Sequence, residues 1–485
     1  MDYSAANSSL WNIIIQLGVM AGMIILATLV RRKVPFIKKS LMPTAVIAGF
    51  LLLILRNTGL LSIDTNVLEM ITYHGIAIGF IALSLRVPTK DSQESGGLTG
   101  LQSGAAIVST YLIQAIAGTV IAIALILTIM PSFFSASGVL IAMGFGQGPG
   151  QANNVGTTYE QAGFAGGHSF ALAIAAAGYL CACIVGVILV NILSRKRKVK
   201  NLGGEEVSGS VTVDSFQDNG EIPISESIDR LSVQFALVLL VYLFTFLVTH
   251  LITSLLDTHL PGVGASISPL LWGFNFIIGS MLSMLVGRVI KGLQKSKVIT
   301  RQYQNNYLMS RISGLAFDIM IIAGIASINI EDLSGLWLPF VLFVLAGGVI
   351  TLIYLAIICK RIYKGYYMEG LASMYGMLTG TISSGVLLLR EIDPEFKTPA
   401  ANNLITGSSF GILLGAPLLI LIGMAPSNIY LVLVLMLVYF AALLPIIMIK
   451  GKKKPSSSDA APKGEQAGEA EVAQVVEVTE ETTAQ

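Results

Sequence analysis

The stretches GFGQGPGQANN (residues 144–154) and GMLTGTISSG (residues 376–385) decide the fold of this chain. Both are rich in glycine and small polar residues, and both interrupt a sequence that is otherwise strongly apolar. Non-helical backbone at membrane depth is tolerated only where protein or a water-filled cavity satisfies its N–H and C=O groups. One such interruption in each half of the chain therefore predicts two broken helices that meet at a binding site or a pathway.

Composition indicates a polytopic membrane protein. Hydrophobic residues make up 54% of the chain and charged residues only 12%, with a mean hydropathy of +0.76. Soluble domains, in contrast, average about a quarter charged residues. We therefore expect an all-α fold whose partner is a lipid bilayer, and no nucleic-acid partner.

Runs of about 20 apolar residues, the length that a helix needs to cross a bilayer, mark the candidate spans. These runs cover residues 10–30, 41–55, 66–85, 104–129, 168–193, 231–256, 266–287, 312–330, 337–359, 402–424 and 428–449. The two glycine-rich stretches fall outside all of these spans. We interpret the first span as retained, because no small-residue cleavage site of a secretory signal follows it.

Lysine and arginine concentrate in short cytoplasmic loops, so their positions test the orientation of the spans. If residues 137–165 and 370–396 each enter the membrane and return to the same side, only Arg56 of the 30 lysine and arginine residues lies outside. A full crossing by the first stretch would instead place the basic run at 195–200 outside. Trp11, Trp272 and Trp337 then all lie at outer ends of spans, where indole rings are favoured. The pattern predicts two re-entrant hairpins, an external N-terminus and a cytoplasmic C-terminus.

The two halves align in opposite orientations, which predicts inverted-topology repeats. Residues 1–194 form the first repeat and residues 231–425 the second, each with five transmembrane helices and one re-entrant hairpin, at 137–165 and 370–396. The tetrapeptide GHSF at 167–170 follows the first hairpin, as GSSF at 407–410 follows the second. Inverted repeats are a recurring plan of secondary transporters, with the substrate near the bilayer midplane.

Three segments lie outside the predicted repeats. Residues 195–230 are rich in acidic residues and lack apolar periodicity, which indicates a cytoplasmic linker. Residues 426–450 form one extra transmembrane helix at the C-terminal end. Residues 451–485 contain no aromatic residue and too little apolar surface to offset the entropy of ordering, so we expect a disordered cytoplasmic tail.

The hairpins offer groups that suit a small cation and an anion. Glycines and Pro149 prevent a regular helix and free carbonyl groups, which together with side-chain oxygens suit sodium. A helix that restarts after the break points unpaired N–H groups and its positive dipole end at a carboxylate. The candidate substrate-binding residues are Gln147, Gly148, Gln151, Asn153, Asn154, Thr379, Thr381, Ser383 and Ser384. The candidate ion-binding residues are Gly146, Asn154, Gly380, Asp318, Asn402 and Asn403.

These residues also have structural interpretations. Small residues allow close helix packing, and Ser and Thr can hydrogen-bond to their own helix. Asp318 is the one carboxylate well inside a span, so it is an ion ligand, a proton carrier or an interfacial partner of Arg311. Asn402 and Asn403 are ligands or caps of the helix that follows the second hairpin. Three further polar residues fit the membrane interface: Glu69, His74 and His168.

Metal, cofactor and enzyme sites have no support in the sequence. Cys181, Cys183 and Cys359 fall in apolar spans and make no metal-ligand spacing. No Ser-His-Asp, HExxH or paired-carboxylate arrangement occurs within the spans. We therefore expect no enzymatic activity, no cofactor and no metal beyond transported sodium.

The sequence resembles the sodium/glutamate symporter family, the bacterial glutamate:sodium symporters. The resemblance rests on LMPTAVIAGFL at 41–51, GIAIGF at 75–80, SLR at 84–86 and the two glycine-rich stretches. Where the family typically carries Gly-Gly-Xaa-Gly, this chain has GQGPG at 146–150 and GTISSG at 380–385. The resemblance implies two inverted halves of five spans, a homodimer, and sodium-coupled uptake across the bacterial cytoplasmic membrane. It also implies an elevator-like movement of the hairpin-bearing part.

Three transport functions fit these features. The first is sodium-coupled symport of glutamate or a related small organic anion, and the second is cation/proton antiport. An antiporter needs a titratable carboxylate inside the membrane, and Asp318 is the candidate. The third is a passive channel, whose flux would neither saturate nor depend on a sodium gradient.

Overall fold

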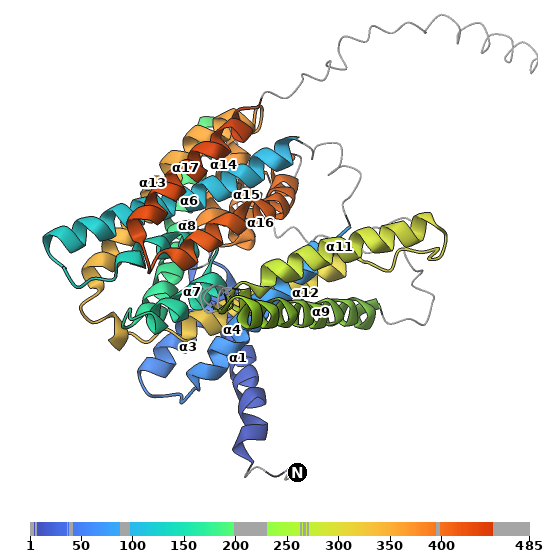
Figure 1. Cartoon of the computed structure of the whole chain (residues 1–485), viewed down its shortest axis with the longest axis horizontal. Helices are drawn as coiled ribbons and strands as arrows, with labels where there is room; N and C mark the ends of the chain where they lie inside the picture. Colours follow the sequence, from blue (N-terminus) through green and yellow to red (C-terminus); the bar gives the residue numbers. More distant parts are fainter. Residues whose placement is uncertain are drawn as a thin grey trace, which may run out of the picture. The chain divides into compact units, whose positions relative to one another are not determined.

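The computed structural model describes residues 4, 7–35, 37, 42–87, 98–197, 230–261, 264, 268, 271–393 and 398–449. The regular secondary structure in these ranges is helical, and its helices belong to one compact unit, Met1–Met448 (Figure 1). The predicted all-α class is therefore confirmed. Most of the predicted linker at 195–230, and the whole of the predicted tail at 451–485, lie outside the described residues.

Among the described residues, ten helices are long and apolar enough to cross a membrane. They are α1 (Ser8–Lys33), α4 (Thr65–Ser84), α6 (Leu98–Thr128), α8 (Gly167–Arg197), α9 (Arg230–His259), α11 (Asn275–Lys295), α12 (Asn306–Ala326), α13 (Trp337–Ile362), α16 (Ala400–Met424) and α17 (Ile429–Met448). The predicted span at 41–55 corresponds to α3 (Thr44–Asn57), which is apolar but shorter. The span predicted at 266–287 overlaps α11, which follows a turn at Phe274.

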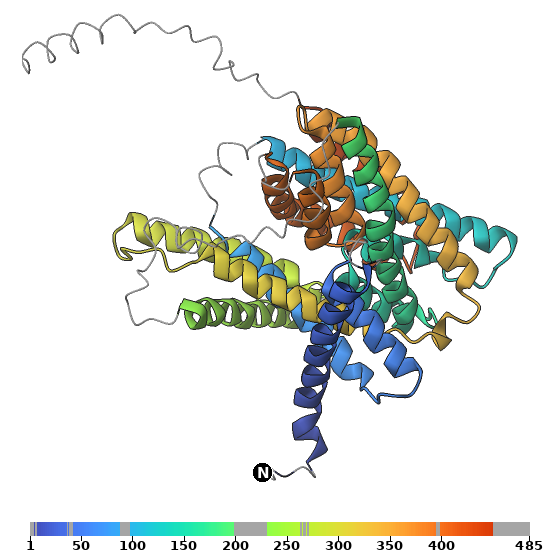
Figure 2. The ribbon, with the colours of Figure 1, turned by 180° about the vertical axis from the view of Figure 1, so that it is seen from behind.

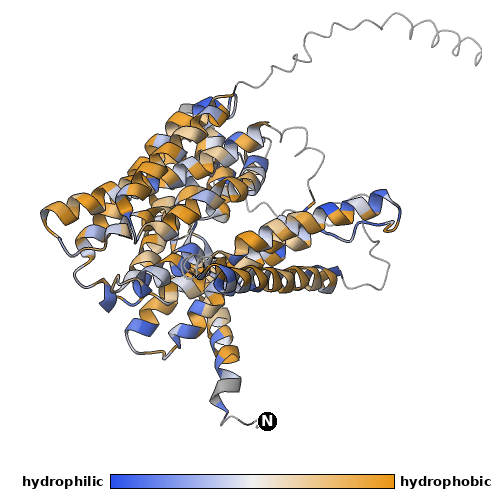
Figure 3. Ribbon diagram, viewed as in Figure 1, coloured by the Kyte–Doolittle hydropathy of each residue, from blue (hydrophilic) through white to orange (hydrophobic). Residues whose placement is uncertain are grey.

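Apolar side chains cover the outside of these helices. On α9, Leu239, Leu243, Leu247 and Leu251 are all exposed, at a spacing of four residues that places them on one face. Figure 3 shows apolar residues along most of the helical lengths and hydrophilic residues mainly near helix ends and in loops. Such a surface is costly in water and favourable in lipid, as expected for a multi-pass membrane protein.

Each glycine-rich stretch interrupts a helical segment. In the first, η1 (Ser135–Val139) and η2 (Ala142–Gly146) precede α7 (Pro149–Gln161), and in the second, α14 (Tyr367–Thr379) precedes α15 (Ile382–Ile392). Gly148 has φ 83° and ψ −173°, a conformation that essentially only glycine adopts. Pro149 follows at the first helical position, where its missing N–H costs no helical bond. At the second break, Gly380 and Thr381 have φ of −142° and −143° and leave the helical region.

Packing divides the helices into two groups, which Figures 1 and 2 show from opposite sides. In the first group α3 packs on α1 and α12, α4 packs on α11 and α12, and α9 packs on α11. In the second group α6 packs on α13, α16 and α17, and α8 packs on α13, α14 and α15. The helix α7 contacts α4 and α12 of the first group and α8 of the second, so it lies where the groups meet.

Glycines allow the closest helix contacts within these groups. A Cβ atom added to Gly118 of α6 would overlap the backbone of Gly138 in η1. In the same way, a Cβ atom on Gly79 of α4 would overlap the ring of Phe317 on α12. Small residues at membrane-helix interfaces let backbones approach in this way.

Candidate functional site

The two helix breaks meet in space, although Gly148 and Gly380 are 232 positions apart along the chain (380 − 148). A Cβ atom built on Gly148 would lie 3.6 Å from the carbonyl oxygen of Gly380 and 3.7 Å from Cγ2 of Thr381. The hydroxyl of Tyr179, on α8, would lie at 3.7 Å from the same atom. The backbone of the first break therefore faces the backbone of the second, with the Tyr179 hydroxyl beside them.

A cavity of about 100 Å³ lies next to this meeting point. Both breaks and both helix groups contribute to its wall. The residues that line it are Ile76, Phe80, Ile107, Tyr111, Gly146, Gln147, Gln151, Phe276, Ile277, Phe317, Met320, Met377, Gly380, Thr381, Ile382, Ser408, Gly411, Ile412, Gly415 and Leu419. Most of these side chains are apolar, and the polar groups come mainly from the two breaks.

The first break supplies unpaired donors at the start of α7. The first backbone bond there runs from the N–H of Ala152 to the carbonyl of Gly148, at 3.1 Å. The N–H groups of Gly150 and Gln151 precede this bond and have no acceptor within the helix. The side chain of Gln151 is 1% exposed and lines the cavity, and neither its Nε2 nor its Oε1 has a hydrogen-bond partner among the described residues. Such a buried, unpaired amide is costly unless a ligand pairs with it.

The predicted residues of the second break divide between the cavity and the helix backbone. Gly380 and Thr381 line the cavity. The hydroxyl of Thr379 donates to the carbonyl of Tyr375 at 2.7 Å, so it bonds back to its own helix. Ser384 is buried with its hydroxyl unpaired among the described residues. Ser383 lies in the first turn of α15, and its side chain is outside the described part of the structure.

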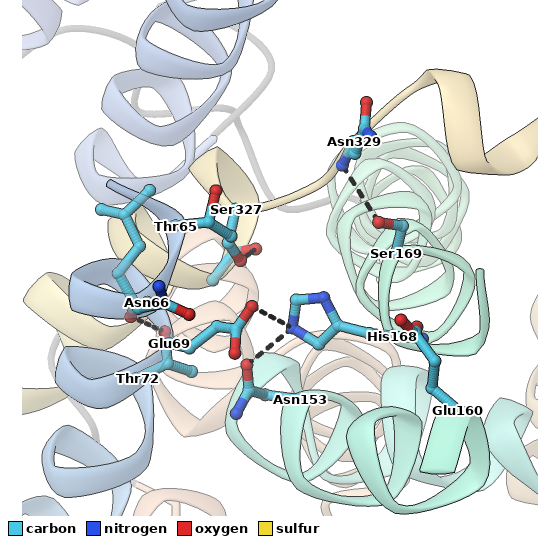
Figure 4. A network of polar contacts seen from close by, with 12 residues as sticks. Thr65, Asn66, Glu69, Thr72, Asn153, Glu160, His168, Ser169, Ser327 and Asn329 are labelled. Carbon is cyan, nitrogen blue, oxygen red and sulfur yellow. Dashed lines mark hydrogen bonds and ion pairs between the residues drawn. The ribbon is translucent and has the colours of Figure 1, made fainter. Parts of the chain in front are cut away.

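Asn153 belongs to a separate polar network at the start of α8. Figure 4 shows His168 between Asn153 and Glu69. Its Nε2 lies 3.0 Å from Oδ1 of Asn153 on α7 and 3.7 Å from Oε1 of Glu69 on α4. The backbone N–H of His168 donates to the carboxylate of Glu160 at 2.9 Å. Asn153 is thus held by a side chain of the protein, and the network joins α4 to α7 and α8.

The neighbouring Ser169 connects this network to the loop before α13. Its hydroxyl donates to Oδ2 of Asp332 at 2.8 Å. The same hydroxyl accepts from the N–H of Asn329 at 3.1 Å (Figure 4). These contacts fix the N-terminal end of α8, which follows the first broken helix. The tetrapeptide at 167–170 therefore anchors the start of α8. None of its four residues lines the cavity.

The other predicted ligands lie away from the cavity wall. Asn154 donates to the carbonyl of Gly273 at 2.5 Å and lines a smaller pocket. Asn403 donates to the hydroxyl of Tyr366 at 2.8 Å. Burial raises the pKa of the Tyr366 hydroxyl above its ordinary value, so this hydroxyl stays neutral in the pair. The carbonyl of Asn402 accepts from the Thr406 hydroxyl at 2.9 Å, within α16.

Asp318 has an exposed side chain on α12, next to the cavity residue Phe317. Arg311 stacks on the ring of Tyr307 at 4.9 Å, and no ion pair joins it to Asp318 in the described structure. Asp318 does not line the cavity, but it interacts electrostatically with Tyr179, whose hydroxyl lies beside Gly148. Its carboxylate is therefore within electrostatic reach of the breaks.

The aromatic residues of the site could not be recognised from the sequence. Tyr179 adjoins the breaks, and Phe80, Phe276 and Phe317 line the cavity. Each of these residues lies in a long apolar span. In such a span, the neighbouring sequence is the same whether an aromatic side chain faces lipid, the protein core or a cavity. No signal in the sequence separates these cases.

No family model matches this chain, and comparison with curated proteins gives no significant match. The function proposed below consequently rests on the two breaks, the cavity between them and the chemistry of its wall.

Proposed function

We propose that this chain is a secondary active transporter that couples sodium entry to symport of glutamate or a related small organic anion. The observation that carries this proposal is the contact of two helix breaks from separate halves of the chain beside one cavity. Broken helices that meet in a membrane protein are a recurring way to expose backbone groups to an ion and a substrate. The proposed location is the cytoplasmic membrane, with the N-terminus outside and the C-terminus inside.

The pairing of helices supports inverted repeats. The contact of α1 with α3 corresponds to that of α9 with α11, and α3 with α12 corresponds to α11 with α4. Likewise, α6 with α16 corresponds to α13 with α8, and α7 with α8 corresponds to α15 with α16. In the contacts α4–α12 and α6–α13, the two helices of each pair are each other's counterparts in the two repeats. Two five-helix repeats related by a twofold axis would produce this set of contacts, with α17 outside the repeat.

The chemistry of the breaks supports an anion and a cation as paired cargo. The start of α7 offers N–H groups and the positive end of a helix dipole, which favour a carboxylate. Gly146 and Gly380 line the same cavity, and backbone carbonyl oxygens at these positions would suit a hard cation such as sodium. Binding both in one place would allow each to increase the affinity for the other.

The position of the cavity supports an elevator-type movement. Its wall combines α4, α11 and α12 of the first helix group with α6, α14 and α16 of the second. A shift of one group past the other would therefore change the access to the cavity from both sides of the membrane. The broken helices would move with α8, because α7, α14 and α15 all pack on it.

Uptake into proteoliposomes tests this function. The purified protein is reconstituted and given radiolabelled amino acids and carboxylates, with and without an inward sodium gradient. We expect saturable uptake that requires the gradient. Flux that neither saturates nor depends on sodium would contradict a coupled carrier and indicate a channel.

Cation/proton antiport is a second candidate because Asp318 lies mid-helix and within electrostatic reach of the breaks. Under the symport proposal, Asp318→Asn keeps measurable sodium-dependent uptake. Under antiport, the same change removes the titratable group and abolishes exchange of cations for protons. Sodium-driven uptake and pH-driven cation flux are measured on the same vesicles, with Glu331→Gln, an exposed carboxylate outside the cavity wall, as the matched control. Loss of cation/proton exchange in Asp318→Asn alone would favour the antiporter.

A further inference from the structure

The wall of the cavity carries no charged side chain. Among the described residues that line it, none is Lys, Arg, His, Asp or Glu. Asp318, which follows the lining residue Phe317 on α12, lies outside the lining. A charged group of a ligand therefore has only uncharged partners in this cavity.

One side of the cavity provides such partners for a single carboxylate. The positive end of α7 and the N–H groups of Gly150 and Gln151 lie at the break. The unpaired amide of Gln151, 1% exposed and part of the lining, gives an independent donor at the same place. These groups together suit one carboxylate head.

The remaining wall is apolar and aromatic. The rings of Phe80 and Phe276 lie 5.0 Å apart between centroids, and those of Phe80 and Phe317 lie 5.3 Å apart. Ile76, from α4, and Met320, from α12, line the same cavity. This wall suits a hydrocarbon body and offers nothing to a second ionised group.

We infer that the cavity takes a small monocarboxylate with an apolar body and no second charge. This inference rests on the proposed transport function and narrows its substrate to an organic anion other than glutamate. The carboxylate lies against the start of α7 and the Gln151 amide, and the body lies against Phe80, Phe276 and Phe317. Glutamate and other dicarboxylates would have to bury a second carboxylate against the apolar wall without a partner, which costs far more than one hydrogen bond recovers.

A matched pair of ligands tests the substrate class. 4-Methyl-2-oxopentanoate has one carboxylate and a branched apolar body, whereas 2-oxoglutarate has the same head and a second carboxylate. Binding is measured from the thermal stabilisation of the purified protein in sodium, and uptake is measured in proteoliposomes. We expect the dissociation constant of the monocarboxylate to be lower by at least about tenfold. Tighter binding of 2-oxoglutarate than of 4-methyl-2-oxopentanoate would overturn the inference.

The two measurements separate this inference from the transport function. Monocarboxylate binding without sodium-driven uptake would overturn the transport function and keep the substrate class. Sodium-driven uptake that prefers dicarboxylates would support the transport function and overturn the substrate class. Absence of both binding and uptake for every carboxylate would overturn both.

Substitution of Gln151 tests the position of the carboxylate. Gln151→Met keeps the length of the side chain and removes its amide, so we expect monocarboxylate binding to weaken by about tenfold. Gln161→Met is the control, because Gln161 lies at the other end of α7 with an exposed side chain. Should Gln151→Met fail to fold, Gln151→Asn, which withdraws the amide by one methylene, is expected to show the same loss. Wild-type affinity in a folded Gln151 variant would contradict the assignment.

Discussion

At the scale of single residues, the conformation of Gly148 determines where α7 begins. Its φ of 83° and ψ of −173° exclude side chains, although a Cβ atom would meet nothing closer than 3.6 Å. Gly148→Ala therefore costs conformational strain rather than a clash, about 1–3 kcal/mol. We expect the folded variant to bind its carboxylate more weakly, because relief of the strain moves the start of α7. Thermal unfolding and ligand binding of the purified variant measure the two effects.

A second glycine separates the loss of stability from the loss of binding. Gly163 also has a positive φ, 103°, with no atom within 4 Å of an added Cβ, and it lies outside the cavity wall. Gly163→Ala should lower stability and leave affinity unchanged. Equal affinity in Gly148→Ala and the wild type would show that the break does not position the ligand.

At the scale of elements, the first broken helix depends on its contact with α6. The backbones of Gly118 and Gly138 approach so closely that a methyl group on either would overlap the other segment. We expect Gly118→Ala to destabilise the protein by about 1–3 kcal/mol through overpacking between two backbones that cannot rotate aside. Loss of thermal stability in detergent, followed by size-exclusion chromatography, measures this effect.

Gly22→Ala controls for the effect of replacing glycine by alanine within a helix that has no close contact at that position. Gly22 lies in the interior of α1, and an added Cβ there meets no atom within 4 Å. Gly22→Ala should keep or raise the melting temperature, because alanine favours helix over glycine. A similar loss in both variants would mean that the close contact of α6 with η1 is not the cause.

At the scale of the whole molecule, the helices of Met1–Met448 form one compact unit. Both breaks, the cavity and the proposed ligand contacts lie within this unit. We therefore expect a chain shortened after residue 454, which keeps the basic residues that follow α17, to retain uptake and thermal stability. Uptake that falls with the truncation, at equal reconstituted amounts, would show that the tail takes part in transport.

The helices were largely predictable from the sequence. Apolar runs long enough to cross a bilayer correspond to ten described helices, because burial in lipid requires continuous hydrophobicity along each one. The span at 41–55 is the partial exception, because α3 has 14 residues and is shorter than each of these ten helices. The interruptions at 144–154 and 376–385 were also predictable, because glycine and proline have local conformational effects that need no tertiary partner.

The sequence by itself determined the all-α membrane class, the helix positions and the location of both breaks. Only the tertiary structure decided that Gly148 and Gly380 face each other, that Gln147 and Gln151 line the cavity, and that Asn153 binds His168 instead. Hydrophobicity and backbone preference are properties of neighbouring residues along the chain. The direction in which a polar side chain points depends on how distant helices pack, so it cannot be inferred from local sequence.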